Sequence, residues 1–114
     1  MTQGFDRNLQ VLTAGAFREV YRRATSLNIA DPLARLLLRL FLGTAVELPV
    51  QDGTTCQIPG ELKAYANLRQ DLLLIGQGDY FEIWAPELWS QQEAQVRDSD
   101  ANSSRFSALT ITTR

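Results

Sequence analysis

Histidine is missing from this sequence of 114 residues, and cysteine occurs once, as Cys56. Without histidine the chain lacks the commonest general base near neutral pH and the commonest metal ligand. A single cysteine cannot form an internal disulfide or a cysteine-rich zinc site, and it indicates a reducing compartment. No carboxylate cluster, nucleophile–base pair or metal-ligand spacing offsets these absences. We therefore expect no enzyme, no metal, no cofactor and no small-molecule substrate.

Long apolar runs are missing as well. No segment approaches the ~20 residues needed to span a bilayer, and no N-terminal signal peptide pattern is present. Lysine and arginine number 11 against 13 aspartate and glutamate, a net charge of −2, whereas a chain held on nucleic acid by bulk electrostatics is normally basic. With 45% apolar and 21% charged residues, the composition is that of one globular domain. We expect a soluble, cytoplasmic protein without membrane contact.

Periodicity and start signals predict three longer helices. Residues 14–27 have apolar side chains at helical spacing, with arginines on the opposite face. Asp31–Pro32 starts a second helix, because aspartate accepts hydrogen bonds from free amides and proline tolerates the first helical position. Gly43 is expected to end it in a left-handed conformation. Pro86 opens a third helix to about Val96. The apolar face of the second helix consists of Leu33, Leu36, Leu37, Leu40 and Phe41.

Strand patterns occupy much of the remaining chain. Residues 9–12 form one candidate strand, and residues 45–50 and 54–58 form a hairpin closed by a tight turn at Asp52–Gly53. A short helix is expected at residues 59–66. Strands at 71–75 and 80–84 follow, joined by a turn at 76–79. The polar stretch 98–104 is predicted to be flexible, and residues 106–113 are β-prone. These elements indicate an α+β fold.

Several side chains have structural interpretations. Cys56, in a predicted strand without a nearby lysine, is expected to be a buried, inert thiol. Trp84 and Trp89 flank Pro86 and are expected to pack on the core or a neighbouring subunit, with base stacking as the minor alternative. Arg35 and Arg39 lie four residues apart beside the leucines, which favours a solvated or interface pair over a phosphate clamp. The cluster Arg18, Arg22 and Arg23, diluted by Glu19, is interpreted as a solvated helix face.

Two stretches of the chain resemble each other at an offset of 72 residues. Residues 9–12 align with residues 81–84, Phe17 aligns with Trp89, and Gly4 aligns with Gly76. Both stretches run turn, strand, spacer, helix, although their identity is low. Order, spacing and residue class favour a duplication over chance similarity.

Specific segments resemble the MraZ family. They are DPLAR at 31–35, RLFLG at 39–43 and IGQGDYFEIW at 75–84, together with Ala45, Glu47 and Trp89. The similarity covers residues 4–96. It implies a bacterial transcriptional regulator related to the AbrB swapped-hairpin fold, with two tandem repeats. It also implies a ring-shaped homo-oligomer that binds direct repeats in the promoter of the division and cell wall gene cluster, and hence nucleoid association.

The loop that the family resemblance associates with DNA departs from the family pattern. In each family repeat, this loop reads Asp, two spacers, Gly, Arg, and three residues later Pro. Counting back from Pro59 puts Gln51 at the Asp, Thr54 at the Gly and Thr55 at the Arg. Arginine is the expected DNA contact because its guanidinium group binds phosphate or guanine in bidentate fashion. Thr55 lacks that group, so no DNA-binding residue is assigned.

The first repeat is expected to be incomplete, because only Met1–Gln3 precede its turn. We hypothesise an N-terminally truncated MraZ-like chain in which Met1 is an internal start. The expected organisation is a remnant of the first AbrB-like repeat (1–30), a linker helix (31–43), a second AbrB-like repeat (44–97) and a flexible C-terminal tail (98–114).

Two functions remain open on the sequence. The first is a DNA-binding regulator of the MraZ type, in which weak contacts from several subunits add up through ring geometry. The second is a degenerate or truncated oligomerisation subunit that no longer binds DNA itself. Its simplest self-assembly would be a swapped-hairpin dimer.

Overall fold

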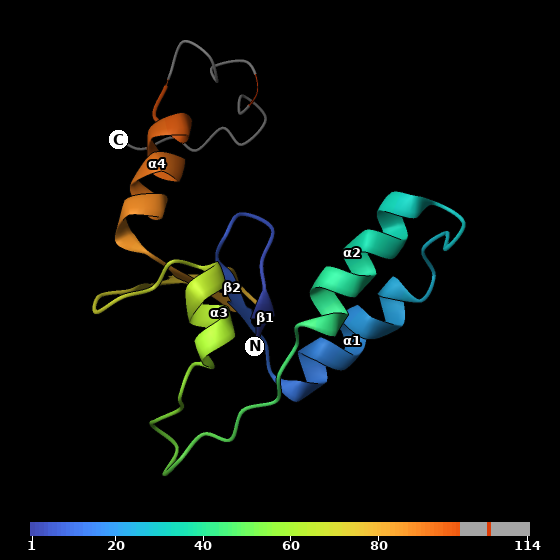
Figure 1. The fold of residues 1–114 in the computed structure, drawn as a ribbon, viewed down its shortest axis with the longest axis horizontal. Helices are drawn as coiled ribbons and strands as arrows, with labels where there is room; N and C mark the ends of the chain where they lie inside the picture. The colour runs from blue at the N-terminus through green and yellow to red at the C-terminus, as the bar shows by residue number, and fades with distance from the viewer. Residues whose placement is uncertain (99–104, 106–114) are drawn as a thin grey trace, which may run out of the picture.

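The computed structural model of the chain describes residues 1–98 and residue 105. Within them, one antiparallel sheet has the order β1-β2-β4-β3. Its strands are β1 (Thr2–Gln3), β2 (Leu9–Val11), β3 (Leu73–Gly76) and β4 (Phe81–Trp84). The helices are α1 (Ala14–Ala24), α2 (Pro32–Gly43), α3 (Gly60–Tyr65) and α4 (Pro86–Val96). Figure 1 shows α3 beside the sheet, α1 and α2 together on one side, and α4 on the other. The expected α+β class is confirmed.

The central strand pair joins the two similar stretches of sequence. The register places Leu9 of β2 opposite Ile83 of β4, and Val11 opposite Phe81. The offset of 72 that aligns Leu9 with Phe81 also aligns Val11 with Ile83, so the pairing is symmetric about its middle. The same offset converts the bounds of α1 into those of α4. The two stretches therefore meet around a local, approximate two-fold axis.

The hydrophobic core lies where α3 packs against this central pair. Its buried members come from α3, its C-terminal turn, β2, β4 and the start of α4: Leu9, Leu62, Ala66, Leu68, Ile83 and Ala85. The C-terminal end of α3 is closed by Asn67 at φ 55°, and the Leu68 amide donates to the Lys63 carbonyl at 2.9 Å. Both are features of a Schellman motif. The Tyr65 hydroxyl donates to the Gly4 carbonyl at 2.7 Å, which ties α3 to the turn after β1.

The starts of α1 and α2 follow from their capping residues. The Thr13 hydroxyl accepts from the Ala16 amide at 3.1 Å, and the Asp31 carboxylate accepts from the Leu33 amide at 2.9 Å. The predicted start at Asp31–Pro32 is confirmed. The predicted left-handed end at Gly43 is wrong, because Gly43 is helical and Thr44 follows at φ −100°. The Thr44 hydroxyl instead accepts from the Gln3 amide at 3.3 Å, so the end of α2 is held by β1.

The helical pair α1–α2 contributes little to the core. Phe41 is the buried residue of α2, and α1 has none. The Phe41 ring stacks on Phe17 at a centroid distance of 6.0 Å and on Phe5 at 6.3 Å. The expected apolar face of α2 is present, but its leucines are exposed. Sequence periodicity identified the face without revealing that the described chain buries Phe41 and leaves the four leucines 38–74% exposed.

The hairpin expected at residues 45–50 and 54–58 is wrong. In the structure this segment is a long connection from α2 to α3 with one isolated bridge, between Gln51 and Thr55. Val46 instead exchanges two backbone hydrogen bonds with Met1, at 2.8 and 3.0 Å. The edge beside β2 is occupied by β1, a strand of two residues that periodicity cannot detect. Apart from Val46 beside Met1, the β-prone residues of the segment pair with no strand of the sheet.

Expectations for the C-terminal part of the chain lie mostly outside the described residues. This applies to the flexible stretch 98–104, except Asp98, and to the β-prone stretch 106–113. Among the helices that the structure does describe, none has the length and apolar character needed to cross a membrane.

Candidate functional site

The tip of the α2–α3 connection is the position to which the sequence assigns DNA contact. The Gln51 carbonyl accepts from the amides of Thr54 and Thr55 at 3.0 Å each, and the Gln51 amide donates to the Thr55 carbonyl at 2.6 Å. Asp52 and Gly53 have φ values of 53° and 68°, the left-handed conformation that a tight hairpin turn requires. The turn predicted at Asp52–Gly53 is confirmed, and Thr55 is exposed beside it.

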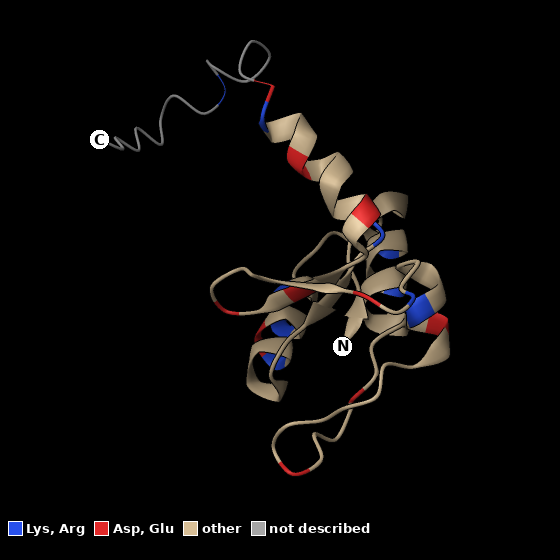
Figure 2. Cartoon of the chain, turned by 90° about the vertical axis from the view of Figure 1, so that its left-hand side faces the viewer, with Lys and Arg blue, Asp and Glu red and all other residues tan. Residues whose placement is uncertain are grey.

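The charge of this connection is negative. Residues 45–59 contain Glu47 and Asp52 and no lysine or arginine. In Figure 2 the long loop below the sheet carries positions coloured as acidic (red) and none coloured as basic (blue). Thr55 can therefore offer a phosphate only its hydroxyl, because its amide already donates to the Gln51 carbonyl, and Asp52 lies three residues away. This connection has the geometry of a protruding loop, but it lacks the positively charged side chain that would make it bind DNA strongly.

Cys56 follows the turn and is exposed, so the prediction of a buried thiol is wrong. That prediction depended on a strand that does not form. The charge of Cys56 acts on the Met1 amino group. Burial lowers the pKa of that amino group, and the charge of Cys56 offsets part of the decrease.

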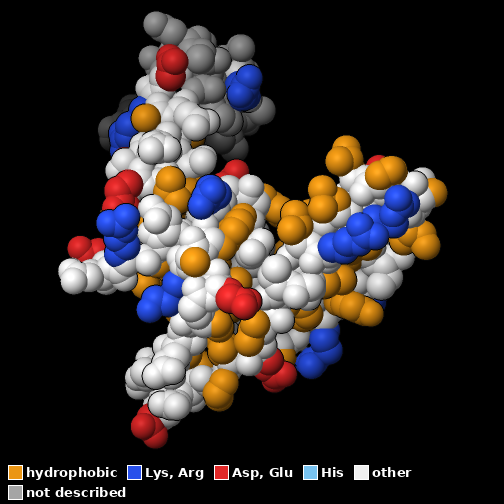
Figure 3. All heavy atoms as spheres, viewed as in Figure 1, with side chains coloured by type: hydrophobic (Ala, Val, Ile, Leu, Met, Phe, Trp, Pro, Cys, Tyr) orange, Lys and Arg blue, Asp and Glu red, His pale blue; other side chains and the backbone are white. Residues whose placement is uncertain are grey.

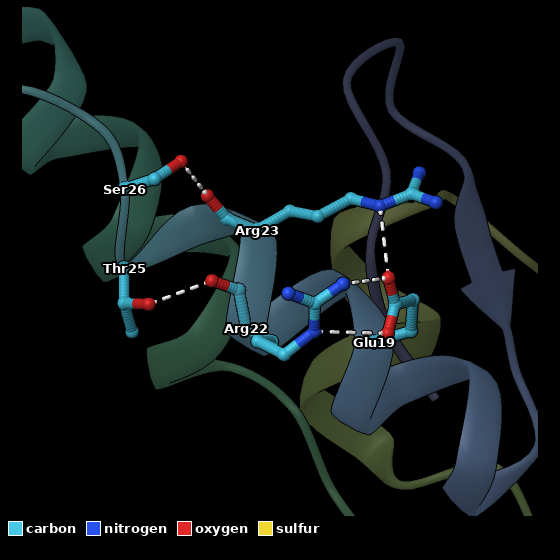
Figure 4. A network of polar contacts seen from close by, with 5 residues as sticks. All are labelled: Glu19, Arg22, Arg23, Thr25 and Ser26. Atoms are coloured by element: carbon cyan, nitrogen blue, oxygen red, sulfur yellow. Dashed lines mark hydrogen bonds and ion pairs between the residues drawn. The ribbon is translucent and has the colours of Figure 1, made fainter.

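The densest basic region lies on α1. Glu19 accepts from Arg22 at 2.6 Å and from Arg23 at 3.2 Å, as Figure 4 shows. Hydrogen bonding to Arg22 lowers the pKa of the Glu19 carboxyl; desolvation opposes the shift and Arg23 adds to it. Both arginines are about three-quarters exposed. The interpretation of this cluster as a solvated helix face is consistent with the structure.

The two arginines of α2 form no ion pair with a carboxylate within the described residues. Arg35 donates to the Ile29 carbonyl at 2.8 Å, which ties it to the connection between α1 and α2. Arg35 and Arg39 are both exposed. Figure 3 shows basic side chains bordering the hydrophobic atoms of this helical pair.

The tryptophans act in packing. Trp84 is buried, and its ring meets Trp89 edge to face at a centroid distance of 5.5 Å. The Trp84 indole donates to the Glu82 carboxylate at 2.9 Å. A buried ring held in this way has no free face for a base, so the packing prediction is confirmed for Trp84.

Other surfaces of the described chain fit no small ligand well. A hollow between the end of α3 and the start of α4 is lined by Asn67, Arg69, Gln70, Asp71, Pro86 and Glu87. Its two carboxylates outweigh its single arginine, which disfavours a phosphate. Among the residues with defined positions, no group of three or more His, Cys, Asp or Glu side chains is placed to hold a metal ion.

Comparison with known proteins places this geometry in context. A family model described as "MraZ protein, putative antitoxin-like" matches residues 56–110. The "Transcriptional regulator MraZ" of Micrococcus luteus is 33% identical over 105 residues, covering 88% of this chain and 73% of that protein. The chain belongs to the MraZ family.

Two further MraZ relatives show how much of a relative's length this chain matches. The regulator of Thermomicrobium roseum is 33% identical, and the match covers 81% of this chain and 65% of the relative. That of Halorhodospira halophila is 37% identical, with coverage of 78% and 59%. The chain thus spans less than two thirds of the length of these two MraZ proteins. The resemblance noted in the segments 31–43 and 75–84 is confirmed as family membership.

Proposed function

We propose that this chain is a DNA-binding transcriptional regulator of the MraZ type. The observation that carries the proposal is its similarity, over about four fifths of its length, to proteins named transcriptional regulators. In this proposal it acts in the cytoplasm at the nucleoid, on direct repeats in the promoter of the division and cell wall gene cluster. It catalyses no reaction.

The proposed mechanism is multivalent. The net charge of −2 and the acidic α2–α3 connection argue against tight binding by one subunit. In a homo-oligomer, weak contacts to successive DNA repeats add, because each bound subunit raises the effective DNA concentration for its neighbour. A ring of subunits would place equivalent turns at regular intervals along the promoter.

We propose the same domain organisation that the sequence indicates. Residues 1–30 are the remnant of a first AbrB-like repeat, 31–43 the linker helix, 44–97 the second repeat and 98–114 the tail. The symmetric register of β2 with β4 and the matching bounds of α1 and α4 support this division.

A second function is favoured by the composition of the turn. The chain would be an oligomerisation subunit without DNA contact, pairing with itself as a swapped-hairpin dimer or mixing with longer copies. The supporting observation is that Thr55 stands where the family pattern has arginine, within a segment that carries only Glu47 and Asp52 as charges.

Fluorescence anisotropy with a labelled promoter fragment containing the direct repeats separates the two functions. The regulator proposal expects binding at low salt that weakens linearly on a log–log plot as salt increases. Replacing Thr55→Arg should tighten binding by ~1–2 kcal/mol if the turn faces phosphate or a base edge.

Thr55→Gln is the matched control, because it enlarges the side chain without adding charge. Equal effects of the two substitutions would exclude an electrostatic contact at the turn. Absence of binding by the wild-type chain and by Thr55→Arg at low salt would leave the oligomerisation subunit as the function.

A further inference from the structure

The end of helix α1 presents two hydroxyl groups directly after a pair of arginines. Residues 22–26 read Arg-Arg-Ala-Thr-Ser. Thr25 and Ser26 are both exposed, and so are residues 27–31, which complete the connection to α2. Figure 4 shows the two hydroxyl residues at the end of the helix, with the arginine side chains extending from the turn before them. A modifying enzyme can therefore reach these hydroxyls without unfolding the core.

The other serine and threonine hydroxyls of the described chain lack this setting. Thr2 is fully buried. Thr54 and Thr55 are exposed, but every charged residue in the surrounding segment 45–59 is acidic. The remaining hydroxyl residues have no lysine or arginine among the four residues before them: Thr13, Thr44 and Ser90. Among the described hydroxyls, only those at the end of α1 therefore follow closely on basic side chains.

Both hydroxyls help to close the last turn of α1. The Thr25 hydroxyl donates to the Arg22 carbonyl and the Ser26 hydroxyl donates to the Arg23 carbonyl, each at 2.6 Å. Carbonyls in the last turn of a helix have no helical amide to accept from, so these side chains take that role. The two arginine side chains turn back to Glu19 at 2.6 and 3.2 Å. Because exposed ion pairs of this kind are weak, the arginines are free to exchange Glu19 for a stronger anion.

We propose that Thr25 is a phosphorylation site for a Ser/Thr protein kinase that selects basic substrates. Arg22 and Arg23 stand three and two residues before Thr25, and such kinases select this charge pattern through carboxylates in their substrate groove. The Thr25 oxygen attacks the γ-phosphorus of ATP, the bond from that phosphorus to its bridging oxygen breaks, and ADP leaves. The hydroxyl proton passes to the catalytic carboxylate of the kinase. This inference goes beyond the proposed DNA-binding regulator and does not depend on it.

The phosphate alters the end of α1 in two ways. It places a charge of about −1.5 to −2 beside the last carbonyls, which form the negative end of the helix dipole. It also removes the proton that Thr25 donates to the Arg22 carbonyl. Arg22 and Arg23 gain an anion that accepts strong, charge-assisted hydrogen bonds, and they leave Glu19 for it. Because α1 has no buried residue to hold its last turn, we expect this turn to unwind.

Incubation of the purified 114-residue chain with ATP and a basophilic Ser/Thr kinase tests the site. We expect incorporation to approach one phosphate per chain, mapped to Thr25 by mass spectrometry. Thr25→Val keeps the shape of the side chain and should abolish incorporation, whereas Ser26→Ala should leave it unchanged. Arg22→Gln with Arg23→Gln should slow incorporation at least ~tenfold, because two charge-assisted contacts to the kinase are lost. Arg18→Gln is the matched control on the same helix and should be phosphorylated like the wild type.

Peptide mapping of the chain purified from the cells that make it extends the test to its natural setting. We expect phosphate on Thr25 in growing or in stationary cells. Its absence from both would overturn the proposal. Incorporation that persists in Thr25→Val, or that is lost only in Ser26→Ala, would overturn the assignment to Thr25. Equal rates for the double arginine variant and the wild type would overturn recognition of the arginine pair.

Hydrogen exchange of the phosphorylated chain measures the effect on α1. Amides of residues 21–25 should exchange at least ~tenfold faster than in the unmodified chain, while amides of β2 and β4 keep their rates. Thr25→Val removes the same donated hydrogen bond without adding charge, so it should accelerate exchange less. Unchanged exchange after phosphorylation would contradict the unwinding. None of these measurements involves DNA, so failure of the phosphorylation site and failure of the proposed regulator are distinguishable.

Discussion

Gly4 shows how a single residue fixes the first turn. Its amide donates to the Asn8 carbonyl at 2.8 Å, and a Cβ at this position would lie 2.7 Å from Asn8 Cγ. Asn8 is fully buried, and its side-chain oxygen accepts from the Asp6 amide at 3.2 Å. The turn between β1 and β2 therefore depends on the absence of a side chain at residue 4.

Replacing Gly4→Ala should destabilise the fold by ~1–3 kcal/mol, because the buried Asn8 side chain must move. Chemical denaturation monitored by circular dichroism measures the effect. Gly15→Ala is the matched control, since the nearest atom to a Cβ there is 4.0 Å away and alanine in a helix gains up to ~1 kcal/mol over glycine. A Gly4→Ala protein as stable as the wild type would contradict this account of the turn.

Glu19 makes the stability of α1 depend on pH. Because its folded-state pKa lies below its unfolded value, its contribution to stability is present above the unfolded pKa and is lost as pH falls through the folded pKa. Glu19→Gln should therefore lower the thermal midpoint at about pH 7 and leave it nearly unchanged at about pH 3. Thermal melts at both values check this, and an equal loss at both would show that charge is not involved.

At the scale of elements, helix-start signals predicted well, and so did the strand patterns at residues 9–12, 71–75 and 80–84, which overlap β2, β3 and β4. Asp31–Pro32 and Pro86 start α2 and α4 where expected, because a cap acts through atoms within a few residues. The strand residues at 45–50 and 54–58 failed as predictors, since a strand also needs a neighbouring edge that local sequence does not specify. At the candidate site, the turn at Asp52–Gly53 was predictable from residue type. The predicted burial of Cys56 was wrong because it depended on a strand that does not form.

Helix α3 should be the element on which the core depends. Leu62 is 3% exposed and packs in the cluster with Leu9 and Ile83. Leu62→Ala should cost ~2–5 kcal/mol of unfolding free energy through lost burial and a residual cavity. Val50→Ala, in the exposed connection, should change stability by no more than ~0.5 kcal/mol. Urea unfolding of both variants compares them directly.

The whole molecule divides into a packed part and a loosely attached part. The sheet and α3 hold nearly all the core, while α1 and α2 contribute Phe41. The contacts of α2 with the sheet run through Thr44, Thr2 and Phe41. Local opening of α1 and α2 should therefore require less free energy than opening of the sheet.

Hydrogen exchange measured by mass spectrometry tests this division. In a dilute, monomeric sample, amides of α1 and α2 should exchange at least ~tenfold faster than those of β2 and β4. Phe41→Ala should accelerate exchange in α1 and α2 further without affecting β4. Uniform protection across the chain would contradict the division, and protection of α2 that rises with protein concentration would indicate self-association.

The pairing of β2 with β4 also determines when the sheet can form during synthesis of the chain. These strands are neighbours in the sheet but are separated by about 70 residues, which a ribosome adds in roughly 4–14 s at ~5–20 residues per second. For most of that interval Leu9 has neither Ile83 nor Leu62 to cover it. Strand β2 therefore keeps an unpaired edge and an uncovered apolar side chain until β4 has been made, and such an edge promotes aggregation of newly synthesised chains.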